Sequence, residues 1–224
     1  MKRGSPQIED VYSILAREFK KHRMPVVDLI EAQTDDPFKV LLATILSART
    51  RDETTTQAAL RLFKLVKTPK DLSNIPLNEL EKVIYPVGFF RDKARHLKEL
   101  PTVLEEKFGG SIPQSVEELI QLPGVGRKTA NLVVAVAFKK PAVCVDIHVH
   151  RIFNRLGYLK TKNPLETEIT LRQIFPQKFW TTFNSYFVSF GQHTCVPVKP
   201  KCTQCPILEY CSRVGVKEPV SKTS

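Results

Sequence analysis

The stretch Leu122-Pro123-Gly124-Val125-Gly126-Arg127-Lys128-Thr129-Ala130 places a tight double-glycine turn directly before a helix start. Glycine tolerates positive φ angles, and a turn without side chains leaves its backbone N–H groups uncovered. The helix that follows points the positive end of its dipole in the same direction, so the segment can bind a phosphate without regard to base sequence. An ordinary tight turn between two helices is the alternative, because a bare G-x-G pattern is a weak signal.

The same stretch superficially resembles a nucleotide-binding P-loop, because it contains Arg-Lys-Thr after a glycine. A P-loop requires four residues between its two glycines and a lysine directly after the second one. Here Val125 alone separates the glycines, and Arg127 stands between Gly126 and the lysine. The spacing therefore excludes a P-loop.

A lysine and an acid near this turn are candidates for chemistry. Lys128 lies at the expected helix start, and Asp146 follows it by eighteen residues in the run Val145-Asp146-Ile147-His148. Taken alone, the lysine reads as a solvated surface residue. The acid reads equally well as an N-cap, since an apolar-periodic stretch follows it as far as Leu156.

Four of the five cysteines are spaced C-x6-C-x2-C-x5-C, at Cys195, Cys202, Cys205 and Cys211. In a reducing compartment such clustering indicates a metal site rather than disulfides. The spacing differs from the twin close pairs of most structural zinc sites, yet by itself it leaves zinc and an iron–sulfur cluster nearly even. The fifth, Cys144, stands in an apolar run and is interpreted as a small buried residue.

The chain has 224 residues and a net charge of +11, from 34 Lys and Arg against 23 Asp and Glu. This balance favours a polyanionic partner, with nucleic acid first and an anionic membrane surface second. No apolar stretch approaches the ~20 residues needed to span a bilayer, and the basic start lacks the apolar region of a secretory signal. We expect an intracellular protein located with the DNA, in the cytoplasm or nucleoid, or in the nucleus of a eukaryote.

The helical periodicity and the small number of glycines, nine in all, predict an all-α protein. The segment 132–138 is rich in β-branched residues and would suit a buried strand, but its entry through the glycine turn favours a helix. Ser115, with Glu118 three residues on, predicts a capping box. Helices are expected from Asp10 to Phe19 and over 40–46, 55–66, 77–84, 91–108 and 115–120.

Together the hairpin segment, the Val-Asp-x-His run and the cysteine spacing resemble the endonuclease III family, whose members are DNA glycosylases and abasic-site lyases. The resemblance extends over almost the whole chain. It implies two helical domains with the DNA cleft between them: a central domain over 31–140 with a helix-hairpin-helix motif, and a terminal domain over 1–30 plus 141–224. It also implies a [4Fe–4S] cluster on the loop at 195–211 and a monomer that binds double-stranded DNA containing damaged bases or abasic sites.

The resemblance further implies the chemistry. Lys128 matches the family's nucleophile, which attacks the sugar and forms a Schiff base that permits β-elimination, and Asp146 matches its catalytic carboxylate. Oxidised pyrimidines are the expected substrates, because the monofunctional branches usually lack the lysine. The alternatives are a mismatch-specific thymine or uracil glycosylase and a non-catalytic iron–sulfur protein that binds DNA or senses redox state.

Other DNA contacts are carried over residue by residue. Arg49 stands where family members commonly have Gln, a residue that fills the gap left by the extruded nucleotide; an arginine there would favour an opposite guanine. Phe89 matches an apolar wedge, with a core aromatic as the alternative. The remaining predicted contacts are the hairpin residues Leu122, Gly124, Val125 and Gly126 and, unless they belong only to a solvated basic loop, Lys199 and Lys201.

Two histidines follow the acid, and His148 and His150 are spaced as a possible metal pair. We favour a supporting hydrogen bond for His148 and a surface position for His150.

Overall fold

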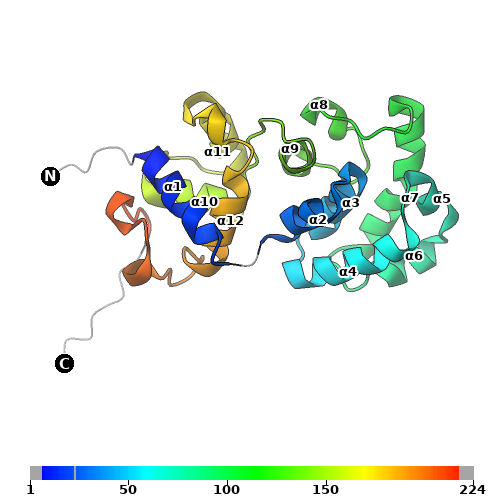
Figure 1. Ribbon diagram of the computed structural model, residues 1–224, viewed down its shortest axis with the longest axis horizontal. Helices are drawn as coiled ribbons and strands as arrows, with labels where there is room; N and C mark the ends of the chain where they lie inside the picture. Colours follow the sequence, from blue (N-terminus) through cyan, green and yellow to red (C-terminus); the bar gives the residue numbers. More distant parts are fainter. Residues whose placement is uncertain (1–6, 23, 217–224) are drawn as a thin grey trace. The chain divides into compact units, whose positions relative to one another are not determined.

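The computed structural model describes residues 7–22 and 24–216, and within that part every regular element is helical (Figure 1). The basic start, residues 1–6, lies outside the described residues. Contacts divide the chain into a central unit, Pro25–Cys144, and a terminal unit formed by Met1–Met24 and Val145–Ser224. The predicted limits of the central domain, 31 and 140, lie six and four residues inside these bounds. That each unit is a domain in its own right stays a prediction.

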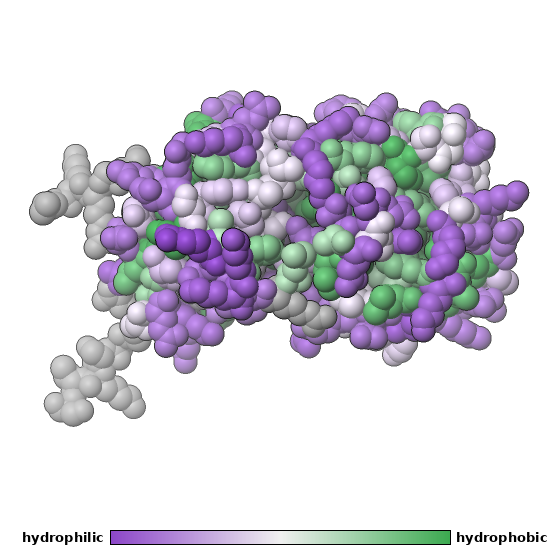
Figure 2. Space-filling view, in the orientation of Figure 1, coloured by the Kyte–Doolittle hydropathy of each residue, from purple (hydrophilic) through white to green (hydrophobic). Residues whose placement is uncertain are grey.

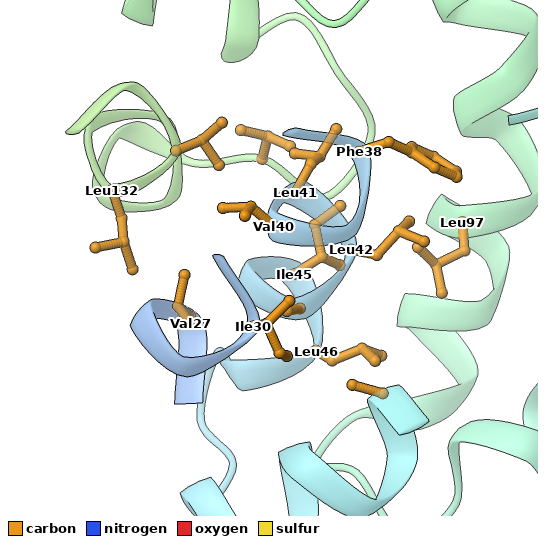
Figure 3. Close-up of a cluster of buried hydrophobic side chains, with 14 of the residues drawn as sticks. Val27, Ile30, Phe38, Val40, Leu41, Leu42, Ile45, Leu46, Leu97 and Leu132 are labelled. Atoms are coloured by element: carbon orange, nitrogen blue, oxygen red, sulfur yellow. The ribbon is translucent and has the colours of Figure 1, made fainter. Parts of the chain in front are cut away.

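The central unit is built around one buried helix, α3. Asp36 opens this helix, because its carboxylate accepts hydrogen bonds from the backbone N–H groups of Phe38 at 2.9 Å and Lys39 at 3.4 Å. A helix that is apolar on all sides must lie in the middle of a core. Side chains from α2, α7 and α9 surround it (Figure 3). The helices of this unit are α2 (Val26–Thr34), α3 (Pro37–Ser47), α4 (Asp52–Leu65), α5 (Pro69–Asn74), α6 (Leu77–Ile84), α7 (Phe90–Phe108), α8 (Val116–Leu119) and α9 (Arg127–Ala137).

The terminal unit joins the start of the chain to its last third. Helix α12 packs against both α1 and α10. The core of the terminal unit is aromatic. The rings of Phe153 and Phe187 stack with their centroids 4.6 Å apart, and Phe175 meets Phe153 edge to face. Stacked and edge-to-face pairs are favourable arrangements for buried rings. The elements are α1 (Ile8–Phe19), α10 (Ile147–Leu156), α11 (Pro164–Ile174), η1 (Gln177–Phe179), α12 (Phe183–His193), η2 (Cys202–Gln204) and η3 (Leu208–Tyr210).

The predicted all-α class is confirmed, and several predicted helices match closely. The expected helix over 77–84 is α6, and the ambiguous segment 132–138 lies in α9 as far as Ala137. Ser115 caps α8 by accepting a hydrogen bond from the N–H of Glu118 at 3.2 Å, although the Glu118 carboxylate accepts from the Ser115 hydroxyl at 2.6 Å and so departs from the predicted capping box.

Hydrophilic side chains cover most of the face shown in Figure 2, with apolar patches between them. Of the helices in the described ranges, none combines the length and the apolar character needed to cross a membrane.

Candidate active site

The predicted hairpin lies between α8 and α9. Gly124 has φ +74°, so the expected left-handed glycine is present. A Cβ at this position would also lie 2.8 Å from Nδ1 of His96, so a side chain would have to displace the His96 ring as well as strain the backbone. Gly126, which could also have adopted a positive φ, has extended backbone with φ −88° and is the N-cap residue of α9.

Leu122 and Val125 have a different part in the hairpin from the glycines. Their side chains are buried in the core of the central unit. The N–H of Val125 donates to the carbonyl of Leu122 at 3.2 Å and thereby closes the turn. These two residues fix the shape of the hairpin, and any contact that they make with DNA must come from the backbone.

Lys128 is the second residue of α9 and is exposed. The helix behind it is firmly anchored, because Ala130, Asn131 and Val133 are fully buried. The carbonyl of Lys128 accepts from the thiol of Cys144 at 3.7 Å, which fits the buried position predicted for that cysteine. The structure thus presents an amine at a rigid helix N-terminus, directly after the hairpin.

Asp146 belongs to the terminal unit and is buried. Its Oδ1 atom accepts hydrogen bonds from the N–H groups of His148 at 2.8 Å and Val149 at 2.9 Å. The carboxylate is therefore the N-cap of α10, as the sequence allowed. These bonds also fix the orientation of the carboxylate, so capping and a catalytic role are compatible.

The two histidines after Asp146 both lie within hydrogen-bonding distance of side chains of the terminal unit. Nδ1 of His148 lies 3.1 Å from Nη2 of Arg151, which fits the predicted supporting hydrogen bond. The predicted surface position of His150 is wrong: the ring is half-buried, and its Nδ1 lies 2.7 Å from the hydroxyl of Thr167. Burial lowers the pKa of His150. The threonine comes from α11, an element that the sequence did not indicate, so this contact could not be foreseen.

Two arginines on α10 hold the loop that begins at Cys195. Arg151 donates from Nε at 3.0 Å and from Nη2 at 2.8 Å to the carbonyl of Cys195. Arg155 donates to the carbonyls of Val196 at 2.8 Å and Pro197 at 2.7 Å. The helix that Asp146 caps therefore also supports the cysteine loop. Arg151 and Arg155 are four residues apart, so the sequence already indicated that they lie on one face of a helix.

The four cysteines of the loop are free thiols that line one pocket with apolar residues such as Ile152 and Leu156. Within the described ranges, no three His, Cys, Asp or Glu side chains lie close enough to share one metal ion. The thiols are instead spread around a common space, as a cluster requires when each of its irons takes one thiolate. The four are Cys195, Cys202, Cys205 and Cys211.

N–H donors also point at two of these sulfurs. Nη1 of Arg155 lies 3.4 Å from Sγ of Cys195, and the N–H of Arg213 lies 3.4 Å from Sγ of Cys211. Such donors stabilise thiolates. Burial raises the pKa of the free Cys205 thiol to about 11, and a bound cation would favour its thiolate form. The donor set and its surroundings thus fit an iron–sulfur cluster.

Arg49 and Phe89 lie together in the central unit, although 40 residues separate them in the chain. The guanidinium carbon of Arg49 lies 5.4 Å from the centroid of the Phe89 ring. Both side chains are exposed, Phe89 with 58% of its surface accessible, so the alternative of a core aromatic is wrong for Phe89. Its neighbour Phe90 instead packs against the core.

One functional candidate was missed. Lys93 is only 6% exposed, and its ammonium donates to oxygens of the loop that carries Arg49. Burial lowers its pKa to about 8, so the amine stays mostly protonated at neutral pH. The sequence did hold a signal, because Lys93 stands in the helical register of the buried residues Leu97, Leu100 and Leu104.

Lys199 and Lys201 are exposed on the cysteine loop, and Lys199 has φ +52°. The N–H of Lys201 donates to the carbonyl of Thr194 at 3.0 Å, which ties this part of the loop to the end of α12. That the two lysines contact DNA stays a prediction.

Comparisons with known proteins identify the family. Residues 42–177 match the model of the HhH-GPD superfamily base excision DNA repair protein, and residues 195–211 match the iron–sulfur binding domain of endonuclease III. The second match begins at Cys195 and ends at Cys211, the outer two of the four cysteines.

Individual relatives agree with the family models. Endonuclease III of Thermotoga maritima is 48% identical over 176 residues, which covers 79% of this chain and 83% of that protein. Among solved structures, a non-covalent endonuclease III–DNA complex is 38% identical with a TM-score of 0.82, over 92% of this chain and 94% of that chain. A trapped endonuclease III–DNA covalent intermediate is 37% identical with a TM-score of 0.80, over 92% of this chain and 95% of that chain. Matches of this extent show that the chain belongs to the endonuclease III family: it is a bifunctional DNA glycosylase and abasic-site lyase of base excision repair, and it carries a [4Fe–4S] cluster.

Proposed function

We propose that this enzyme excises oxidised pyrimidines from double-stranded DNA through a Schiff base on Lys128. The exposed amine at the N-terminus of α9, directly after the hairpin, is the observation that carries the proposal. The backbone at this helix end attracts a phosphate, and a bound phosphate brings the adjoining sugar to the amine. Positioning of this kind makes the attack effectively intramolecular.

The proposed reaction begins with an attack on the sugar and ends with release of the lysine. The neutral amine of Lys128 attacks C1′ of the sugar, and the bond from C1′ to the base breaks as the base leaves with a proton. The C1′–O4′ bond of the sugar ring then breaks, O4′ takes up a proton, and an iminium forms between C1′ and the lysine nitrogen. This iminium acidifies the C2′ proton; when that proton is removed, the C3′–O bond breaks and releases the 3′ phosphate. Water then hydrolyses the imine and frees the lysine.

Asp146 is the proposed catalytic carboxylate. Its negative charge would stabilise the positive charge that builds on the sugar as the base departs. The hydrogen bonds from His148 and Val149 hold one of its oxygens in place. Such preorganisation means that the group does not have to reorient during the reaction.

We also propose the contacts that seat the duplex. Backbone groups of the hairpin from Leu122 to Gly126 bind phosphate, and Lys199 and Lys201 add charge from the cluster loop. The enzyme acts as a monomer within the DNA compartment of the cell. These contacts carry no sequence information, as a repair enzyme requires.

The experiment that tests the function uses the wild-type enzyme and a panel of duplexes. Thymine glycol, a thymine–guanine mismatch and a preformed abasic site are each presented with and without sodium borohydride. We expect base release and strand cleavage at thymine glycol, with a covalent adduct trapped by borohydride. Activity only at the mismatch would support a mismatch-specific glycosylase instead. Binding without release of any base would support a non-catalytic role.

The opposite-base preference depends on Arg49, whose side chain is exposed beside Phe89. If the guanidinium fills the vacated space and donates to the base opposite the extruded nucleotide, guanine should be favoured over adenine, because the guanine edge offers two acceptors. We expect faster single-turnover excision of one lesion opposite guanine, by at most about 1–3 kcal/mol of discrimination.

The matched variant is Arg49→Gln, which restores the residue common in the family and leaves Lys128 and Asp146 unchanged. It should flatten the preference while excision continues. Equal rates opposite all four bases in the wild-type enzyme would show that Arg49 only fills space or contacts phosphate.

The cluster can be tested by Cys202→Ser. Wild-type protein should be brown and should contain about four irons per chain, as Cys ligation of [4Fe–4S] implies. The serine variant should lose the visible absorbance, and its DNA affinity should fall because the loop that carries Lys199 and Lys201 is no longer held. Cys144→Ser is the control, since Cys144 is buried in the central unit and should leave the iron content unchanged. Colourless wild-type protein with one zinc would contradict the assignment.

A further inference from the structure

Two loops of the central unit are tied together beside Arg49 and Phe89. The hydroxyl of Thr50 accepts a hydrogen bond from the N–H of Gly88 at 3.1 Å. The two backbones touch at this point, because a Cβ at Gly88 would lie 2.6 Å from the carbonyl oxygen of Arg49. Arg49 is next in sequence to Thr50, and Phe89 is next to Gly88, so each exposed residue adjoins one partner of this hydrogen bond.

Lys93 is the centre of this tie. Its ammonium donates to the carbonyls of Leu46 at 2.8 Å and Ala48 at 2.6 Å, and to the hydroxyl of Thr50 at 3.2 Å. The two carbonyls belong to the C-terminal end of α3, where backbone acceptors lack partners within the helix and the dipole favours a cation. A buried charge is costly unless it is fully hydrogen-bonded, and here three donors meet three oxygens.

The backbone of both exposed residues is held in an uncommon conformation. Arg49 has φ +54° and Phe89 has φ +58°, in the left-handed region that residues with a side chain seldom adopt. Such conformations persist only where the surrounding structure over-determines them. For Arg49 the constraint comes from Ala48 and Thr50 on either side, and both of these are bonded to Lys93.

We propose that Lys93 is a positioning residue that holds Arg49 and Phe89 as one preformed wedge for the gap left by the extruded nucleotide. The inference rests on the proposed roles of Arg49 and Phe89 at the DNA. Without the tie, each loop would have to be ordered when the duplex binds, so extrusion from a stacked duplex would become slower. Lys93 itself is buried, and its ammonium donates to oxygens at the end of α3 and in the loop that follows, which distinguishes it from a catalytic residue.

The test compares two substrates for the variant Lys93→Met, which keeps the length of the side chain and removes its donors. One substrate has thymine glycol opposite adenine; the other has the same lesion opposite a tetrahydrofuran abasic analogue. The second has no base pair to break and no widowed base, so its extrusion depends less on a wedge. We expect single-turnover excision to fall roughly tenfold or more on the first substrate but only about threefold or less on the second, since unpaired nucleotides cost least to extrude.

Lys98→Met is the matched control. Lys98 lies on the same helix, α7, and its ammonium donates to the carbonyls of Ser73 at 2.7 Å and Ile75 at 2.6 Å, at the C-terminal end of α5. Its loss should lower the thermal midpoint, as the loss of Lys93 should, but it should leave the ratio of the two excision rates at the wild-type value. A general loss of stability therefore cannot imitate the expected result.

The outcomes separate the two proposals. A wild-type enzyme that is inactive on both substrates would overturn the proposed function. If the wild type is active and Lys93→Met slows both substrates equally, or slows neither, the positioning role is wrong. If Lys93→Met does not fold, Thr50→Val decides: it removes the hydroxyl that joins Lys93 to Gly88 and should change the ratio in the same direction. An unchanged ratio in that variant would overturn the inference.

Discussion

Replacing Lys128 with glutamine is expected to abolish strand cleavage and borohydride trapping while duplex binding stays nearly unchanged. An amide nitrogen cannot attack C1′, so base release should fall by roughly 10³-fold or more, which corresponds to at least about 4 kcal/mol of lost transition-state stabilisation. Glutamine forms helices about as well as lysine, and the buried face of α9 is untouched, so folding should be retained. Single-turnover cleavage of a thymine-glycol duplex and electrophoretic detection of the trapped adduct measure the two effects.

The neighbouring residue provides the control. Arg127 is exposed at the first position of α9, and Arg127→Gln removes one positive charge from the same helix end while it leaves the amine in place. Both variants should weaken duplex binding by a similar small factor, because affinity depends mainly on the number of phosphate contacts. Arg127→Gln alone should still form the trapped adduct. An undiminished adduct in Lys128→Gln would show that a different amine is the nucleophile.

Local chemistry allowed much of the fold to be predicted from the sequence. Apolar positions three and four residues apart predicted the bounds of α6, and the glycine turn favoured a helix for the segment that lies in α9. Asp146 and Ser115 cap helices as their positions indicated. In each case the signal lies within a few residues, where hydrogen bonding and periodicity act directly.

Features that depend on distant parts of the chain were not predictable in the same way. His150 was placed at the surface because its partner Thr167 lies on another helix. Gly126 could have adopted a positive φ, but it is an extended N-cap, and its conformation is set by the entry into α9. The bounds of the two units follow from contacts between α1 and α12, which composition does not encode.

The candidate site also contains both kinds of feature, those that local motifs indicate and those that depend on distant parts of the chain. Lys128 and Asp146 could be chosen because they match segments of the endonuclease III family, and the four cysteines because of their spacing; the structure places the thiols around one pocket. The tie at Lys93 could be suspected only from a lysine in an apolar helical register, and its acceptors lie 43 to 47 residues away in the chain. Buried polar contacts of this kind are specified by tertiary structure, so pattern reasoning identifies an anomaly but not its partner.

The second large effect is expected for Asp146→Asn, a change that separates the charge of this residue from its role as a cap. Asparagine is as good an N-cap as aspartate, so its side-chain oxygen can still accept from the N–H groups of His148 and Val149. The thermal midpoint and the cluster absorbance should therefore stay close to those of the wild type. Asp146→Ala, in contrast, removes both the cap and the charge and should cost about 0.5–2 kcal/mol of stability.

Excision should respond differently from stability. The carboxylate is proposed to stabilise positive charge on the sugar while the base departs, so Asp146→Asn should slow release of thymine glycol by roughly 10²- to 10⁴-fold. Cleavage at a preformed abasic site should fall less, because no base has to leave before the amine of Lys128 reacts. Single-turnover rates on the two substrates measure this difference. If Asp146→Asn excises thymine glycol within about threefold of the wild-type rate, well below the loss expected for a catalytic acid or base, then Asp146 acts only as the cap of α10.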